Sequence, residues 1–311
     1  MDNARVFAFL YDRLNAGEAA VLVTITSVQG SSMREAGTHM GVAADGSFAG
    51  SLSGGCIENA VVAEALEAVN EGAPRIVRFG AGSPYIDIKL PCGGGLDIHF
   101  LPLMDADFIT ACQFAITERR PFAMLLPTQG GAKFLPDWHS TEILPDGNAV
   151  IGHWPAPRLI VLGHGASVPA LARLALQMHL EVEVLSSDPA IVAELESDAN
   201  ARHLLSPADT EKLNSDPWSA IVFLFHDHDW EAALMARAME LPHFYLGAMG
   251  GRKAHAMRTQ SLKKMGCGEE GIAKIRAPIG LFHSSRDPES LALSALGEVV
   301  ESYHAANFSN G

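Results

Sequence analysis

A chain of 311 residues is too long for one typical hydrophobic core, so its length predicts two domains. Hydrophobic residues make up 48% of it and charged residues 19%, a composition that predicts a soluble globular protein and excludes a disordered one. The formal net charge of -14 argues against general binding to nucleic acid or to anionic membrane surfaces.

The first seventeen residues predict an amphipathic helix, and they lack the basic leader of a signal peptide. No apolar run reaches membrane-spanning length. The four cysteines form no Cys-x-x-Cys pair and no zinc-binding spacing. Scattered free thiols fit a reducing cytoplasm, which is the location we expect. The apolar residues of the predicted helix are Val6, Phe7, Phe9, Leu10 and Leu14.

Strands and turns follow this helix. We predict strands over residues 20–25, 39–42 and 48–52, with Asp45-Gly46 as a two-residue hairpin turn between the last two. A loop of small residues separates the first two strands. It either contacts a ligand through its amides and Arg34 or is a solvated connection.

A Gly-Gly-Cys turn joins the hairpin to a predicted helix that ends at Gly72. Gly54 and Gly55 permit a backbone turn that side chains would obstruct. Cys56 would then lie at a helix N-terminus, where the helix dipole favours the thiolate form. Cys56 is therefore a candidate nucleophile or a soft ligand for metal or sulfur. The alternative is a tight turn with a packed thiol.

A second turn of this kind contains Cys92, Gly93 and Gly94. Its glycines predict a close backbone approach or a bulge. The two cysteine turns either form one site or are unrelated, and both alternatives stay open. The strands predicted around the second turn are residues 75–79, 86–90 and 97–101.

The first domain closes with a helix and an antiparallel region. Residues 105–120 predict the helix, and Cys112 lies on its apolar stripe, which favours a core position. Residues 121–151 alternate short apolar runs with turns, and residues 155–157 predict a linker. The expected domains are residues 1–154 and 158–311.

The second domain opens with a strand, a Gly-x-Gly turn at Gly163 and Gly165, a helix and another strand. This is the Rossmann arrangement, which places a phosphate at a helix N-terminus. Val168 occupies the position of the third glycine. Ser186 and Ser187 stand where an acidic residue would bind a ribose hydroxyl. The dinucleotide-binding fold is expected, and NAD(P) binding is left open.

Polar residues follow the next buried strand, residues 220–225, at the edge where such sheets bind ligands. His226, His228 and Asp229 are one conceivable metal set. Loop histidines with an aspartate that caps the next helix are the favoured alternative.

A further strand-turn-helix contains Gly250 and Arg252, and residues 252–276 carry an excess of basic residues. This excess suits a phosphate-bearing ligand or an acidic partner, with a solvated helix face as the alternative. Asp287 is expected to cap a last helix. Together the elements predict an α/β protein. An N-terminal mixed α+β domain precedes a Rossmann-like domain with a doubly wound parallel sheet.

In order and number, these motifs resemble the XdhC/CoxI family of xanthine dehydrogenase accessory proteins, over nearly the whole chain. The N-terminal motifs that carry the resemblance are Gly30-Ser31-Ser32 with Arg34 and Gly37, Gly54-Gly55-Cys56 with Glu58, and Cys92-Gly93-Gly94-Gly95. The C-terminal ones are the Gly163/Gly165 turn, His226-Asp227, Tyr245-Leu246-Gly247-Ala248-Met249-Gly250 and Ala277-Pro278-Ile279-Gly280-Leu281.

The resemblance implies a chaperone for molybdenum cofactor, either molybdopterin or its dinucleotide form. Such a protein helps the cofactor acquire its terminal sulfido ligand with a cysteine desulfurase and passes it to an apo-molybdenum hydroxylase. Cys56 would contact molybdenum or sulfur, and Glu58 would orient a ligand or accept a proton; these are the candidate catalytic residues. The candidate cofactor-binding residues are Arg34, Gly54, Gly55, Cys92, Gly93, Gly94, Gly163, Gly165, Ser186, His226, Gly250 and Arg252.

The chain departs from the family pattern at Val168, at Ser186 and Ser187, and at residues 282–285, and these departures concern the nucleotide half of the site. Two other functions stay open. The Rossmann half alone suggests an NAD(P)-dependent oxidoreductase, and structural cysteines would suit an interaction scaffold. A homodimer is also an open alternative.

Overall fold

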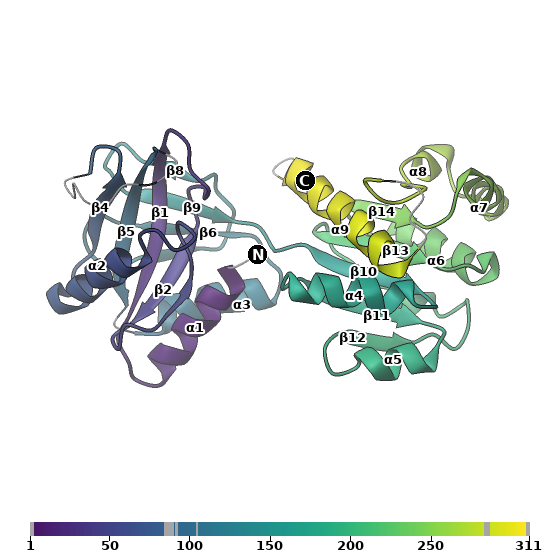
Figure 1. Cartoon of the computed structure of the whole chain (residues 1–311), viewed down its shortest axis with the longest axis horizontal. Helices are drawn as coiled ribbons and strands as arrows, with labels where there is room; N and C mark the ends of the chain where they lie inside the picture. The colour runs from purple at the N-terminus through teal and green to yellow at the C-terminus, as the bar shows by residue number, and fades with distance from the viewer. Residues whose placement is uncertain (1–2, 84–89, 91–92, 104, 283–286, 309–311) are drawn as a thin grey trace. The chain divides into compact units, whose positions relative to one another are not determined.

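The computed structural model of the chain describes residues 3–83, 90, 93–103, 105–282 and 287–308. Backbone contacts divide the chain between Pro155 and Ala156 into two compact units, which we call the N-terminal and C-terminal units (Figure 1). None of the helices in the described ranges has both the length and the apolar character that crossing a membrane requires.

The N-terminal unit contains two antiparallel sheets. The first has the strand order β3-β2-β1-β5-β4 and the second the order β7-β6-β9-β8. The second sheet is the antiparallel region expected over residues 121–151. The strands are β1 (Ala20–Gln29), β2 (His39–Ala43), β3 (Phe48–Gly50), β4 (Arg75–Gly80), β5 (Gly95–Leu103), β6 (Phe122–Leu126), β7 (Lys133–Leu135), β8 (Glu142–Ile143) and β9 (Ala149–His153). The helices are α1 (Asn3–Asn15), α2 (Glu58–Glu71) and α3 (Asp107–Thr117).

Strand β1 shows how the N-terminal unit is layered. Successive side chains of a strand point to opposite faces of the sheet. Val21 and Val23 pack with α2 on one face, whereas Ala20 and Leu22 pack with α1, α3 and the second sheet on the other. The first sheet therefore has one hydrophobic core on each face.

Three local predictions can be compared with this unit. The β2–β3 hairpin forms, but its loop has three residues, because the Ala43 N–H donates to the Ser47 carbonyl. Gly46 has a φ of 82°, which gives this longer loop the left-handed residue it needs. Gly72 ends α2 as predicted, with a φ of 65°. The strand expected over residues 86–90 lies almost entirely outside the described residues.

The C-terminal unit is built on a five-stranded parallel sheet of order β12-β11-β10-β13-β14, and it confirms the predicted Rossmann-like doubly wound architecture. Its strands are β10 (Arg158–Gly163), β11 (Glu181–Ser186), β12 (Asn200–His203), β13 (Ser219–Leu224) and β14 (Tyr245–Ala248). Its helices are α4 (Ser167–Gln177), α5 (Pro189–Leu195), the 3-10 helix η1 (Thr210–Lys212), α6 (His228–Glu240), α7 (Arg252–Lys264), α8 (Glu269–Ala273) and α9 (Pro288–Ala305).

Helices cover both faces of the parallel sheet (Figure 1). Leu159 and Val161 of β10 pack with α4, α5 and α9, whereas Ile160 and Leu162 pack with α6, α7 and α8. A strand buried on both faces must be apolar at every position, which explains the continuous hydrophobic runs of β10 and β13. The turns that follow these strands lie at the carboxyl edge of the sheet, where ligands bind in this fold.

Candidate functional site

The turn between β3 and α2 is organised by a buried carboxylate. Glu58 is the first residue of α2 and is 7% exposed. Its Oε1 accepts hydrogen bonds from the Ser51 hydroxyl at 2.7 Å, the Ser53 N–H at 2.9 Å and the Leu52 N–H at 3.2 Å. Its Oε2 accepts from the Ser53 hydroxyl at 2.7 Å and the Ile57 N–H at 3.1 Å. One side chain therefore holds both ends of the turn.

These contacts determine the charge of Glu58. Burial raises the pKa of the carboxyl, but hydrogen bonds from the Ser51 and Ser53 hydroxyls and from the Ser53 N–H outweigh burial and lower the pKa to about 2. A carboxylate with so low a pKa is ionised at neutral pH and is a weak base. We therefore expect Glu58 to position the turn, not to accept a proton.

Cys56 lies exposed on this turn, two residues before the start of α2. Its N–H donates to the Ser53 hydroxyl at 2.9 Å, so the backbone at the thiol is fixed by the same network. Gly54 and Gly55 have φ values of 77° and 110°, a region that residues with a side chain rarely adopt. The two glycines thus allow the chain to reverse and leave the Cys56 side chain accessible.

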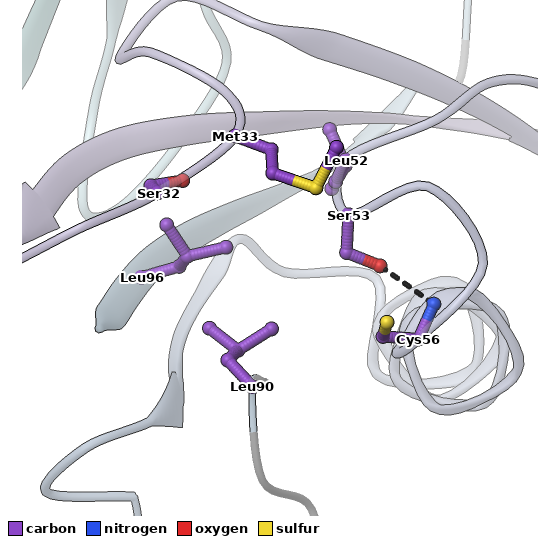
Figure 2. Close-up of a pocket in the computed structure, with 7 residues that line it drawn as sticks. All are labelled: Ser32, Met33, Leu52, Ser53, Cys56, Leu90 and Leu96. Atoms are coloured by element: carbon purple, nitrogen blue, oxygen red, sulfur yellow. Dashed lines mark hydrogen bonds between the residues drawn. The ribbon is translucent and has the colours of Figure 1, made fainter. Parts of the chain in front are cut away.

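A pocket opens beside the thiol. Its empty volume is about 340 Å³, part of it open to solvent, and most of the side chains around it are apolar. Figure 2 shows these side chains converging from three segments of the chain. Met33 is 80% exposed, so one wall of the pocket is a solvent-facing side chain. The lining residues are Ser32, Met33, Leu52, Ser53, Cys56, Leu90 and Leu96.

The second glycine turn lies against the loop that contains Arg34. A Cβ on Gly94 would overlap the Ser31 carbonyl oxygen, so only glycine allows the start of β5 to approach this loop. The Arg34 N–H donates to the Ser32 hydroxyl at 3.1 Å. Because Ser32 also lines the pocket, the structure brings Arg34, Gly93 and Gly94 near the Cys56 turn. Cys92 lies outside the described residues.

The predicted sites of the C-terminal unit gather at the carboxyl edge of the parallel sheet. Gly165 has a φ of 82° in the turn between β10 and α4. A Cβ on Gly163 would meet the Leu224 backbone at 2.8 Å, so the glycine permits close packing at the ends of the strands. The ring centroids of His164 and His226 are 5.8 Å apart. The loops after β10 and β13 are therefore neighbours, as the predicted nucleotide site requires.

The end of β11 does not supply the acidic group that binds a ribose. Ser186 is fully buried, and its hydroxyl donates to the Gly163 carbonyl at 2.7 Å. The Asp188 carboxylate accepts the Ala190 N–H at 2.9 Å and caps α5. Both polar side chains thus bind the protein's own backbone, and β11 ends in serine where the acidic residue of a nicotinamide dinucleotide site is expected.

The contacts agree with two of the expectations that gave a residue a structural role: an aspartate that caps the helix after β13, and a core position for Cys112. Asp227 caps α6 by accepting the Asp229 N–H at 2.9 Å. In the described parts of the chain, no three His, Cys, Asp or Glu side chains are placed to hold a metal ion; the His228 side chain lies outside them. Cys112 is buried in the core around α3, and burial raises the pKa of its thiol.

Sequence reasoning missed two sets of polar residues. Ser51 and Ser53 hold the Cys56 turn, and the signal available was a serine before a helix start, a position that favours side-chain hydrogen bonds to backbone N–H groups. Arg258 and Glu231 form a buried ion pair at 2.8 Å between α7 and α6. Their surroundings in the sequence are those of a solvated helix, so no local signal marks them.

The architecture and the thiol turn define a protein with a Rossmann-type unit and a separate cysteine-bearing unit. Residues 159–299 match the XdhC Rossmann domain and residues 13–80 match the XdhC and CoxI family. The chain is 32% identical to the molybdenum cofactor insertion chaperone PaoD of Escherichia coli K12, over 96% of this chain and 88% of PaoD. The chain belongs to the XdhC and CoxI family, as its motifs predicted.

Other similar proteins agree with this placement. A probable xanthine dehydrogenase component of Bacillus subtilis 168 is 25% identical, over 91% of this chain and 93% of that protein. A crystal structure of a xanthine dehydrogenase from Bacillus halodurans superposes with a TM-score of 0.82 at 22% identity. That alignment covers 100% of this chain and 98% of the other, and it shows that the two share a fold.

Proposed function

We propose that this chain is a molybdenum cofactor-binding chaperone. It assists sulfuration of the cofactor and its insertion into a molybdenum hydroxylase of the xanthine dehydrogenase or aldehyde oxidase type. The similarity to PaoD over most of both chains supports the role of an insertion chaperone. The partners of this function are an apo-hydroxylase and a cysteine desulfurase, and its cellular location is the cytoplasm.

The observation that carries the proposal is the exposed Cys56 thiol at the edge of a small pocket. Thiolates are soft ligands and suit molybdenum or its sulfur ligands. The turn that presents the thiol is held by Glu58, so the sulfur is positioned before the cofactor arrives. In this role Cys56 contacts the metal centre, and Glu58 acts through the position of Cys56.

The remaining site residues are assigned within each unit separately. In the N-terminal unit, Arg34 and the amides around Gly93 and Gly94 would contact the organic part of the cargo near the pocket. In the C-terminal unit, the Gly163–Gly165 turn would form a phosphate site of its own at the start of α4. The oxidoreductase alternative is weaker, because Ser186 stands at the ribose position, and its hydroxyl and the Oδ1 of Asp188 are bound to backbone groups.

Binding of molybdenum cofactor to the purified apo-chain tests the proposal. We expect stoichiometric binding by the wild type and a loss of affinity of about tenfold or more in Cys56→Ala, since even outer-shell partners of a metal ligand contribute that much. Absorbance of the bound cofactor after gel filtration gives the stoichiometry. Cys267→Ala is the matched control, because Cys267 is a free thiol of the C-terminal unit.

NAD serves as the second ligand in the same measurement. If the folded wild type binds NAD and takes up no molybdenum cofactor, the chaperone function is wrong and the oxidoreductase replaces it. Equal cofactor affinity in wild type and Cys56→Ala would remove Cys56 from the site and leave the assignment of the thiol without support.

A further inference from the structure

Helix α7 begins without the capping carboxylate that precedes three other helices of the C-terminal unit. Helices α5, α6 and α9 each follow an aspartate whose carboxylate accepts a backbone N–H. Helix α7 follows Gly251, no side chain caps it, and its first turn contains no acidic residue. The N–H groups at a helix N-terminus carry a partial positive charge, so α7 presents an uncompensated positive end.

Two basic side chains add to this charge. Arg252 and Lys253 occupy the first positions of α7 and are exposed. Neither forms an ion pair with any residue in the described ranges, whereas Lys263 and Lys274 farther along pair with glutamates. Cations are unfavourable at a helix N-terminus, so a bound anion would stabilise this arrangement.

A buried guanidinium lies behind the same turn. Arg258 is 2% exposed, and its Nη2 donates to the Met249 carbonyl at 2.8 Å and to Glu231 at 2.8 Å. A Cβ on Gly250 would lie 4.0 Å from this nitrogen, so the guanidinium lies beside the turn that precedes α7. The Arg258 Nε and Nη1 are buried and have no hydrogen-bond partner within the described part of the chain.

Unpartnered buried N–H groups of a cation are costly, and their presence calls for an explanation. His255, one turn before Arg258, also has a buried Nδ1 without a partner among the described residues. The turn lies at the carboxyl edge of the sheet, directly after β14, where ligands bind in this fold. A helix N-terminus with arginine and lysine beside it is the arrangement that binds phosphate in proteins.

We propose that the N-terminus of α7 binds a phosphate group, either as free phosphate or as the end of an organic ligand. The first amides of α7, Arg252 and Lys253 contact the phosphate oxygens. Arg258 is a positioning residue, which holds the turn through the Met249 carbonyl and adds positive charge behind it. This site lies wholly in the C-terminal unit and includes Arg252, a candidate cofactor-binding residue, so it rests on the proposed function at that residue. Phosphate binding is measured separately from cofactor binding, so either proposal can fail without the other.

Isothermal titration calorimetry of the full chain with inorganic phosphate, in chloride buffer, tests the site. Replacing both exposed cations, Arg252→Ala with Lys253→Ala, weakens phosphate binding by about tenfold, the size of one lost charge-assisted hydrogen bond. Arg258→Met also weakens it. Glu231→Gln tightens it, because the amide keeps an acceptor for Arg258 but removes the opposing charge. Circular dichroism of each variant checks that it is folded.

Arg258→Met is expected to weaken phosphate binding and Glu231→Gln to tighten it. These opposite effects distinguish a phosphate site from a purely structural ion pair. If Arg258 and Glu231 only hold α6 to α7, Glu231→Gln does not tighten binding, and that result overturns the proposal. No binding of phosphate by the wild type, or equal binding by wild type and the Arg252/Lys253 double variant, also overturns it. Adenosine 5′-monophosphate identifies the source: tighter binding than inorganic phosphate assigns the site to an organic phosphate, and weaker binding assigns it to the free ion.

Discussion

Replacing Glu58 with glutamine lowers the stability of α2 by about 3 kcal/mol, the scale of one to two hydrogen bonds to a charged group. The carboxylate accepts from Ser51, Ser53 and two further backbone N–H groups, and an amide would turn its own NH₂ toward one set of these donors. Hydrogen exchange of the α2 amides in the full chain measures the loss. Glu67→Gln, on the exposed side of the same helix, is the control and should leave exchange unchanged.

The same carboxylate makes the turn sensitive to acid. The pKa of Glu58 is about 2 in the folded chain and 4.5 as its ordinary value, so the folded pKa is the lower one. Its stabilisation is complete above pH 4.5 and is lost as the pH falls toward 2, by about 3 kcal/mol in total. Glu58→Gln should lack this loss. An α2 exchange profile with the same acid dependence in wild type and variant would contradict the assignment.

Acidification from pH 6.5 to about 4 destabilises the N-terminal unit through a buried histidine pair. The Nε2 atoms of His39 and His153 lie 3.2 Å apart, and His39 Nδ1 is hydrogen-bonded to the Thr24 hydroxyl at 2.8 Å. His39 belongs to β2 and His153 to β9, so the pair joins the two sheets. His99 of β5 pairs with Thr24 in register, and its Nε2 is 2.8 Å from the Pro127 carbonyl.

Burial lowers the pKa of His153 to about 4. Burial, followed by the charge of His153, holds the pKa of His39 well below its ordinary value. Burial also lowers the pKa of His99, against the Pro127 hydrogen bond, which raises it. The unfolded chain takes up these protons at a higher pH than the folded chain. Stability is therefore complete above pH 6.5 and falls toward pH 4, by about 3 kcal/mol for His153 alone.

Hydrogen exchange of β2 and β9 amides at pH 7, 6 and 5, corrected for the intrinsic exchange rate, measures this loss. His153→Gln keeps a hydrogen-bonding side chain but cannot titrate, so its pH dependence should be shallower than that of the wild type. The exposed His139 in the same unit gives the control variant His139→Gln, which should follow the wild type. Identical slopes for wild type and His153→Gln would show that the pair does not control acid stability.

The fold could be predicted wherever burial leaves a repeating pattern. The apolar runs of β10 and β13 identified strands buried on both faces, and Asp287 marked the start of α9, where its carboxylate accepts the Ser290 N–H at 2.7 Å. Strand β12 was missed, because its sequence Asn-Ala-Arg-His has none of the apolar alternation of a strand. It is an edge strand, so pairing with β11 decides its conformation.

Some residues of the candidate site could also be predicted from a local sequence pattern, and others could not. Gly54, Gly55 and Cys56 could be identified from a local pattern of turn residues before a helix. The pocket walls could not, because Leu90 and Leu96 are distant from Cys56 in the sequence and line the same pocket only in the folded chain. The partners His39 and His153 are 114 positions apart. A buried polar residue is explained only by its partner. The spacing of two such partners along the chain follows no repeating pattern, so the sequence does not reveal the pair.

The turn around Cys56 also bears on how this position can diversify. In the hydrogen bonds described for the turn, Cys56 takes part through its backbone N–H, and the conformation is fixed by Ser51, Ser53 and Glu58. The Cys56 thiol and the turn that presents it thus depend on different residues. A substitution that keeps the backbone N–H of residue 56 therefore leaves the hydrogen bonds of this turn in place, so the same backbone can present a different side chain.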